Sequence, residues 1–148
     1  MIDRTTNNAG TTLHLPASAD TLIRAHGADT FPDECCGALL GPRQGEIVEA
    51  FPLPNEHQGE RRRRFLLGPT EYKMAEQRAT DMSLELLGFY HSHPDHPAVP
   101  SQFDLDHAWP NLSYIIISVK QRRPDEMRSW RLKADRSGYD EETIEVGN

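Results

Sequence analysis

Two histidines and one carboxylate are spaced so that they could share a metal ion. His91 and His93 are separated by one residue in a mostly apolar stretch that reads as a β-strand. Because side chains of a strand alternate between its faces, both imidazoles would point the same way. Pro94 ends the strand, and Asp104 follows in a segment that begins a short helix. Two imidazoles, one carboxylate and a water are a common ligand set of a catalytic zinc ion.

The same residues also have simpler interpretations. The two histidines could be a partly exposed strand pair, while Ser101 and Asp104 could serve only as the N-cap and third position of a helix, a relative of the capping box. The residue pattern alone leaves both interpretations open. His96 and His107 are expected on a loop and a helix surface, with a contact to the site or substrate as the alternative. Asp106 is expected to be an exposed helix carboxylate.

Strands and helices are mixed along the chain without regular alternation. The patterns predict strands at residues 12–15, 36–41, 46–53, 65–67, 84–93, 112–119, 127–133 and 143–146. Helices are expected from Pro16 to a stop at Gly27, over 68–82, and over 101–108. The segment 84–93 is mostly apolar, which is typical of a central strand. These elements predict an α+β protein, an α-β-α sandwich around a mixed β-sheet.

Length and composition predict a single domain that neither crosses a membrane nor binds nucleic acid. The chain has 148 residues, of which 1–11 are expected to be a flexible polar tail and 12–148 one domain. Its net charge of −7 argues against phosphate neutralisation, and it has no 18-residue apolar run and no apolar N-terminal segment of a signal peptide. Its only two cysteines are adjacent, where a disulfide would be strained, so we expect a reducing, cytoplasmic setting.

The site spacing resembles the signature of the JAMM (MPN+) metalloprotease family. His91-Ser-His93-Pro, six residues and then Ser101-x-x-Asp104 match the family pattern H-[S/T]-H-P-x6-S-x-x-D. The stretch 32–41, which contains Glu34, is similar to the family's Pro-x-Glu-x-Cys-Gly-x-Leu-x-Gly. Further similarities lie at 64–65, after the loop that contains Asn55, and at 88–90 and 114–118. The resemblance covers roughly residues 12–134 and is greatest to bacterial and archaeal single-domain members.

This resemblance implies a fold, a reaction and a partner. The fold would be the JAB1/MPN sandwich, which is related to the cytidine deaminases. His91, His93 and Asp104 would hold one Zn²⁺, which lowers the pKa of a water. Glu34 would accept a proton from that water and pass it to the leaving amine, and Ser101 would hydrogen-bond the oxyanion. The substrate would be the peptide or isopeptide bond after the C-terminal Gly-Gly of a ubiquitin-like or sulfur-carrier protein.

Other readings remain open. A catalytically silent MPN-type scaffold that binds a ubiquitin-like partner is the main alternative, although such relatives usually lack the ligands. A deaminase is disfavoured because its His-x-Glu and Pro-Cys-x-x-Cys patterns are absent. Iron, cobalt or manganese could occupy the same ligands as zinc. The oligomeric state is open, with a homodimer as one alternative.

Two further groups have two interpretations each. Cys36 is expected in the core, with Cys35 or Cys36 as a regulatory zinc ligand in the alternative. The basic run from Arg61 to Arg64 is expected to be a solvated loop, or else a receiver for an acidic partner surface or a product carboxylate.

Overall fold

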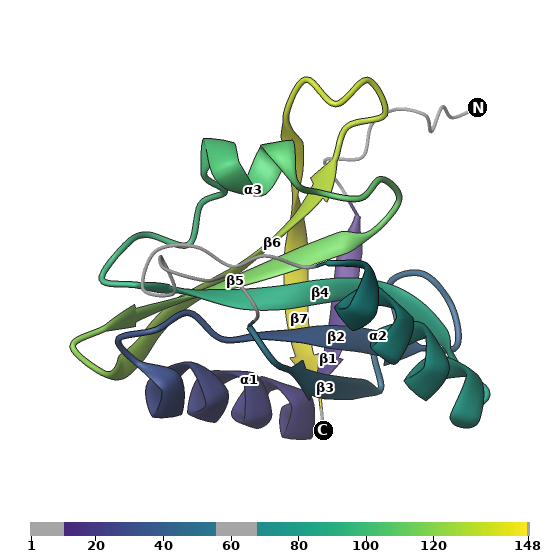
Figure 1. Cartoon of the computed structure of the whole chain (residues 1–148), viewed down its shortest axis with the longest axis horizontal. Helices are drawn as coiled ribbons and strands as arrows, with labels where there is room; N and C mark the ends of the chain where they lie inside the picture. Colours follow the sequence, from purple (N-terminus) through teal and green to yellow (C-terminus); the bar gives the residue numbers. More distant parts are fainter. Residues whose placement is uncertain (1–10, 56–67, 148) are drawn as a thin grey trace.

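The computed structural model describes residues 11–55 and 68–147, and one seven-stranded sheet organises this part of the chain (Figure 1). The strand order is β1-β7-β6-β5-β4-β2-β3. The sheet is mixed, because β1 pairs with β7 and β4 with β5 in parallel while the other pairs are antiparallel. The strands are β1 (Thr12–Pro16), β2 (Cys36–Gly41), β3 (Glu49–Leu53), β4 (Glu85–Pro94), β5 (Ser113–Lys120), β6 (Arg123–Leu132) and β7 (Tyr139–Gly147).

The sheet curls until its two ends meet. The His14 N–H donates to the Gly45 carbonyl at 2.8 Å, and the Ile47 N–H donates to the His14 carbonyl at 3.0 Å. The segment that contains Gly45 and Ile47 leads into β3, so β1 at one end of the strand order contacts the approach to the strand at the other end. This contact satisfies part of an edge that would otherwise expose unpaired backbone groups.

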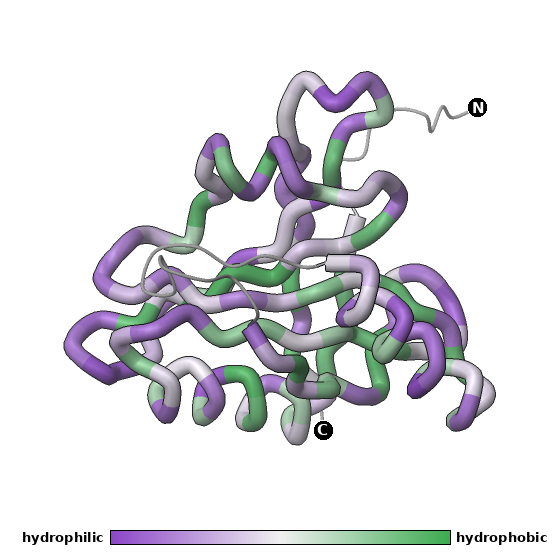
Figure 2. The backbone as a smooth tube through the Cα atoms, viewed as in Figure 1, coloured by the Kyte–Doolittle hydropathy of each residue, from purple (hydrophilic) through white to green (hydrophobic). Residues whose placement is uncertain are grey.

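The described residues form three helices, α1 (Ala17–Thr30), α2 (Pro69–Asp81) and α3 (Gln102–Asp106), of which α1 and α2 pack on the sheet. One apolar core joins α1 to its face of the sheet through residues such as Ile23, Leu39 and Ile117. A second core joins α2 to the opposite face through residues such as Leu40 and Ala75. Figure 2 shows the hydrophobic stretches along the strands and the hydrophilic ones at many turns. The predicted α+β sandwich is therefore confirmed.

Strand β4 lies inside the sheet, between β2 and β5, as its apolar sequence predicts. Gly37 of the neighbouring β2 leaves room for the Tyr90 ring, since a Cβ there would lie 2.1 Å from it. The Tyr90 hydroxyl lies 2.7 Å from His26 Nδ1, so β4 is also tied to α1. These contacts fix the strand that carries the two candidate ligands.

The predicted helix end at Gly27 is wrong, since α1 continues to Thr30. A Cβ at Gly27 would lie 3.0 Å from Val119 of β5, so the glycine permits close packing of helix on sheet and does not end the helix. The predicted strand 46–53 begins only at Glu49, because Glu46 instead forms isolated bridges with Arg43 and His14.

Strands β6 and β7 are longer than predicted, and α3 is shorter than the expected 101–108. Gln121 and Arg122 connect β5 to β6 with φ angles of 51° and 69°. Two successive positive φ values are typical of a type I′ hairpin turn, which usually contains Asn or Gly. Because neither residue is present here, the turn sequence does not reveal the hairpin. The predicted strand 65–67 and the run Arg61–Arg64 lie outside the described residues.

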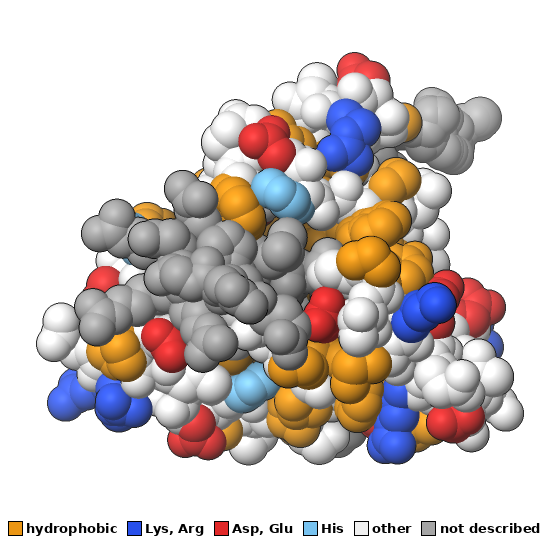
Figure 3. Space-filling view, in the orientation of Figure 1, with side chains coloured by type: hydrophobic (Ala, Val, Ile, Leu, Met, Phe, Trp, Pro, Cys, Tyr) orange, Lys and Arg blue, Asp and Glu red, His pale blue; other side chains and the backbone are white. Residues whose placement is uncertain are grey.

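The surface offers two observations that bear on partners. Among the described residues, no helix is both long and apolar enough to span a membrane. On the face shown in Figure 3, the Lys and Arg side chains of the described residues lie in several separate places.

Candidate metal centre

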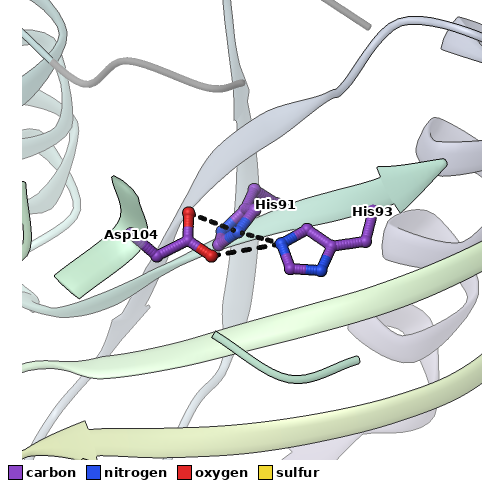
Figure 4. A group of neighbouring side chains, drawn as sticks. All are labelled: His91, His93 and Asp104. Atoms are coloured by element: carbon purple, nitrogen blue, oxygen red, sulfur yellow. Dashed lines mark hydrogen bonds and ion pairs between the residues drawn. The ribbon is translucent and has the colours of Figure 1, made fainter. Parts of the chain in front are cut away.

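His91, His93 and Asp104 bring three ligand atoms together at the end of β4 (Figure 4). The two histidine Nε2 atoms lie 3.1 Å apart. Asp104 Oδ1 lies 3.3 Å from His91 Nε2, and Oδ2 lies 3.1 Å from His93 Nε2. The expected sharing of one strand face by the two imidazoles is thus observed, and α3 supplies the carboxylate.

The spacing of the two imidazoles and the carboxylate fits a single small cation. Ligand atoms about 2.0–2.2 Å from a tetrahedral zinc ion are separated from each other by roughly 3.3–3.6 Å. The two Nε2 atoms lie 3.1 Å apart, and each has one of the two Asp104 carboxylate oxygens within 3.3 Å, so separations of this size are present around the group. Nitrogen and carboxylate donors with a fourth position left for water are also the donor set of catalytic zinc sites.

The loop after β4 sets the tautomer of His93. Its Nδ1–H donates to the Pro97 carbonyl at 2.8 Å, because a carbonyl can only accept. The lone pair of the neutral ring is therefore on Nε2, the atom that faces Asp104. A backbone carbonyl that holds the distal ring nitrogen is a common support for a metal-binding histidine.

Asp104 is both the third helical residue in the α3 capping box and a candidate ligand. The Ser101 hydroxyl accepts from the Asp104 N–H at 3.0 Å, and the Ser101 N–H donates to Asp104 Oδ2 at 2.9 Å. This capping box points the carboxylate at the histidines. Asp104 can therefore serve as a metal ligand and as a helix-capping residue at the same time. Burial alone would raise the pKa of Asp104, but His91 and His93 outweigh burial and hold that pKa well below its usual range. The carboxylate is therefore ionised, as a metal ligand must be.

Neighbouring strands hold the loop that follows β4. The Asp95 N–H donates to the Val119 carbonyl at 2.7 Å, and the Ser118 hydroxyl donates to the His96 carbonyl at 2.6 Å. Trp130 Nε1–H donates to the Ala98 carbonyl at 3.1 Å. Sequence reasoning missed these supports, since nothing in the local pattern around Ser118 or Trp130 points to a residue far away in the chain.

A pocket of about 370 Å³ lies next to the metal-ligand group. Its polar lining includes Glu34, His93 and Ser101, and its apolar lining is Pro97, Val99 and Pro100. Glu34, which lies between α1 and β2, is only 4% exposed. Burial, and secondarily the charge of Asp104, raise the pKa of Glu34 to about 9. Its Oε1 is buried and has no hydrogen-bond partner among the described residues.

Other candidates are placed less centrally. His96 lines the pocket, whereas His107 ends α3, where Nδ1 donates to the Phe103 carbonyl at 2.9 Å. Asp106 is exposed, as expected, and accepts a hydrogen bond from a neighbouring glutamine of α3.

Both cysteines are buried and neither forms a disulfide. Cys35 lies in the α1 core, on the opposite face of the sheet from the ligands, and burial raises its pKa to about 11. Cys36 is paired with His91 in register, but its Sγ lies 3.5–3.6 Å from the carbonyl oxygens of Leu53 and Pro54. The ligand group that the described residues form contains neither thiol.

The fold and the ligand group define a family. The chain belongs to the family described as prokaryotic homologs of the JAB domain, whose model matches residues 16–133. Among solved structures, a protein from Desulfitobacterium hafniense has a TM-score of 0.80 at 33% identity and covers 92% of this chain and 93% of its own. A JAB1/MPN domain protein from Archaeoglobus fulgidus has a TM-score of 0.59 at 20% identity over 92% and 100% of the two chains, a likeness of fold.

Three curated relatives are similar in sequence. A desampylase of Haloferax volcanii is 33% identical over 115 residues, which is 74% of this chain and 83% of the relative. A probable TtuB-protein conjugate cleaving protease of Thermus thermophilus is 34% identical over 110 residues, or 74% and 72% of the two chains. A CysO-cysteine peptidase of Mycobacterium tuberculosis is 31% identical over 134 residues, or 83% and 86%.

Proposed function

We propose that this chain is a zinc-dependent metallopeptidase that hydrolyses the peptide or isopeptide bond after the C-terminal Gly-Gly of a ubiquitin-like or sulfur-carrier protein. One observation carries the proposal: an acidic side chain with a raised pKa and a serine line one pocket beside three converging ligand atoms. The names of the three relatives support a hydrolytic reaction of this class. One is a desampylase, one a probable protease that cleaves TtuB-protein conjugates, and one a CysO-cysteine peptidase.

His91, His93 and Asp104 would hold the single Zn²⁺ ion, because their spacing, tautomer and ionisation fit that cation. When bound, the ion supplies Lewis acidity, which polarises a carbonyl and lowers the pKa of a water. The protein's contribution is to keep the three ligand atoms in place before binding. The capping box and the Pro97 carbonyl do this for Asp104 and His93.

Glu34 would move the proton. Its side chain lines the pocket, and burial raises its pKa to about 9 in the metal-free protein, whereas a cation bound nearby would favour the ionised carboxylate that a base requires. A proton carrier of that kind can take a proton from a water and then deliver it to a leaving amine. Ser101 would stabilise the oxyanion. Its oxygen already accepts from the Asp104 N–H, so its single proton can be donated into the pocket.

The substrate would reach the site as an extended tail. Pro97, Val99 and Pro100 provide an apolar wall that would cover part of the bond from water. We further propose that residues 12–148 act as one JAMM/MPN+ domain in the cytoplasm, with a homodimer as one form of the active enzyme. Residues 1–10 of the expected N-terminal tail lie outside the described residues.

Mass spectrometry tests the proposal directly. A sulfur-carrier protein extended beyond Gly-Gly, an amino-acid adduct and an isopeptide conjugate are incubated with wild type, with Glu34→Gln and with chelator-treated protein. We expect cleavage after Gly-Gly by wild type alone, with zinc retained in Glu34→Gln. Glu34→Gln should lose about 10²- to 10⁴-fold in turnover, which is the usual contribution of a general base.

The control is Asp106→Asn. It changes an exposed carboxylate of α3, the helix that also carries Asp104, and should leave activity unchanged. Zinc-loaded wild type that cleaves none of the three substrate types, yet binds the carrier, would favour the silent scaffold. Full activity in Glu34→Gln would remove Glu34 from the mechanism.

A further inference from the structure

We propose that Ser92 and Asn55 are positioning residues that hold the peptide group between Glu34 and Cys35 and thereby set the place of the Glu34 carboxyl. The inference rests on the proposed function, in which Glu34 moves the proton. Neither residue lines the pocket or belongs to the ligand group.

Both ends of one peptide group are held by side chains. Asn55 Nδ2–H donates to the Glu34 carbonyl at 3.1 Å. The Cys35 N–H donates to Ser92 Oγ at 2.8 Å. The Glu34 carbonyl and the Cys35 N–H belong to the same planar unit, so fixing both atoms fixes the orientation of that plane. The plane in turn restricts ψ of Glu34, and with it the direction in which the side chain leaves the backbone.

A side-chain acceptor is used because the chain departs from the sheet at this point. Strand β2 begins at Cys36, which pairs with His91. One residue earlier the Ser92 N–H still donates to the Cys35 carbonyl at 3.2 Å, but the Cys35 N–H bonds to the serine hydroxyl and not to a strand carbonyl. The backbone can then turn so that Glu34 lines the pocket while Cys35 packs in the α1 core.

The anchor and the metal ligands are consecutive residues of β4. Ser92 is 0% exposed and lies between His91 and His93, on the opposite face of the strand. The strand therefore fixes the ligands with one face and the Glu34 peptide with the other. Any shift of β4 would move the ligands and the peptide anchor together and preserve their relative placement.

Kinetics of Ser92→Ala separate positioning from simple support of the fold. We expect kcat to fall about 10- to 100-fold, since a misplacement near 1 Å has that scale of cost, with KM within about twofold and metal content unchanged. Ser92→Thr keeps the hydroxyl and should retain most of kcat. Asn55→Ala should lower kcat in the same way. It tests the other end of the peptide group if the threonine of Ser92→Thr does not fit the buried site.

Ser113→Ala is the matched control. Ser113 is also a buried strand serine, 1% exposed, and its hydroxyl accepts from Arg131 at 3.3 Å, away from the Glu34 segment. It should keep the wild-type kcat. In a Glu34→Gln background, Ser92→Ala should cause no further loss, because a positioning residue acts only through the residue that it positions.

Several results would overturn the proposal: a Ser92→Ala kcat equal to that of Ser113→Ala, activity lost in proportion to metal, or a further loss in the Glu34→Gln background. A wild type that cleaves nothing would instead count against the proposed function. In that case ¹³C NMR titration of the Glu34 carboxyl in metal-free protein still tests the positioning. We expect a shift of its titration midpoint towards the ordinary glutamate value in Ser92→Ala, and an unchanged midpoint would contradict the inference.

Discussion

The two faces of strand β4 differ in how their polar atoms are satisfied. On the α1 face, the Tyr90 hydroxyl and the Ser92 hydroxyl each have a partner within the protein, at 2.7 and 2.8 Å. On the other face, His91 and His93 direct ring nitrogens at one another and at Asp104, with separations of 3.1–3.3 Å. Residues from both faces are almost fully buried, so exposure does not distinguish them.

The difference shows which face of β4 carries polar groups that the protein itself does not fully satisfy. Partnered polar groups on one face make β4 a firm support, because a buried hydrogen bond is costly to break. The other face gathers lone pairs and a carboxylate that a cation would satisfy better than the side chains satisfy each other. Functional sites are commonly the places where such local conflict is retained.

The largest effect is expected from His91→Ala. Removing one of three ligands should abolish both metal binding and peptidase activity, because the remaining pair cannot complete a catalytic zinc site. Metal content by elemental mass spectrometry and turnover of a Gly-Gly-extended carrier give the two readouts. His107→Ala is the control, since that imidazole stacks on Phe103 at the end of α3. A His91→Ala protein that still binds metal and cleaves the carrier would contradict the assignment of the metal site to this face of β4.

Ser101 should show separable catalytic and capping roles. Ser101→Ala loses both and should lower kcat about 10²- to 10³-fold, with about 1 kcal/mol of stability lost at the cap. Ser101→Asp keeps an acceptor for the Asp104 N–H but has no proton to donate, so it should regain stability without activity. Thermal melts and steady-state kinetics measure the two effects. Recovery of activity in Ser101→Asp would exclude the oxyanion role.

The buried Glu34 should make metal-free protein less stable as pH rises. Its pKa is about 9 in the folded state against an ordinary value of 4.5, so below pH 4.5 the carboxyl is protonated in both states. Between these values the unfolded chain releases a proton that the folded chain keeps, which costs at most about 1.4 kcal/mol per pH unit. Glu34→Gln should therefore gain up to about 3 kcal/mol over wild type between pH 4.5 and 7.

Denaturant unfolding of chelator-treated wild type and Glu34→Gln at several pH values checks this expectation. A stability difference between the two proteins that does not change with pH would mean that the carboxyl ionises normally in the folded state.

The smallest effect is expected from Tyr90→Phe, which removes the hydroxyl bonded to His26. We expect a loss of about 1 kcal/mol of stability, typical of one buried hydrogen bond, with kcat unchanged. Chemical denaturation and kinetics measure both. A large loss of kcat at wild-type metal content would show that the α1 face does more for catalysis than anchor β4 and the Glu34 peptide.

Local sequence rules determined much of the candidate site. The alternation of a strand placed His91 and His93 on one face, and the capping pattern placed Asp104 in the first turn of α3. These features depend on residues near one another in the chain, so the sequence displays them directly. The resemblance of residues 32–41 to a family motif singled out Glu34, which local pattern alone would have treated as a loop carboxylate.

Tertiary structure decided the rest, because it depends on contacts between distant segments. Gly27 looks like a helix stop until β5 is packed against it at Val119. The tautomer of His93 depends on where the Pro97 carbonyl lies, and the place of Glu34 depends on Asn55 and Ser92, 21 and 58 positions away along the chain. A sequence states which groups can bond, but only the folded backbone decides which of them come within about 3 Å of one another.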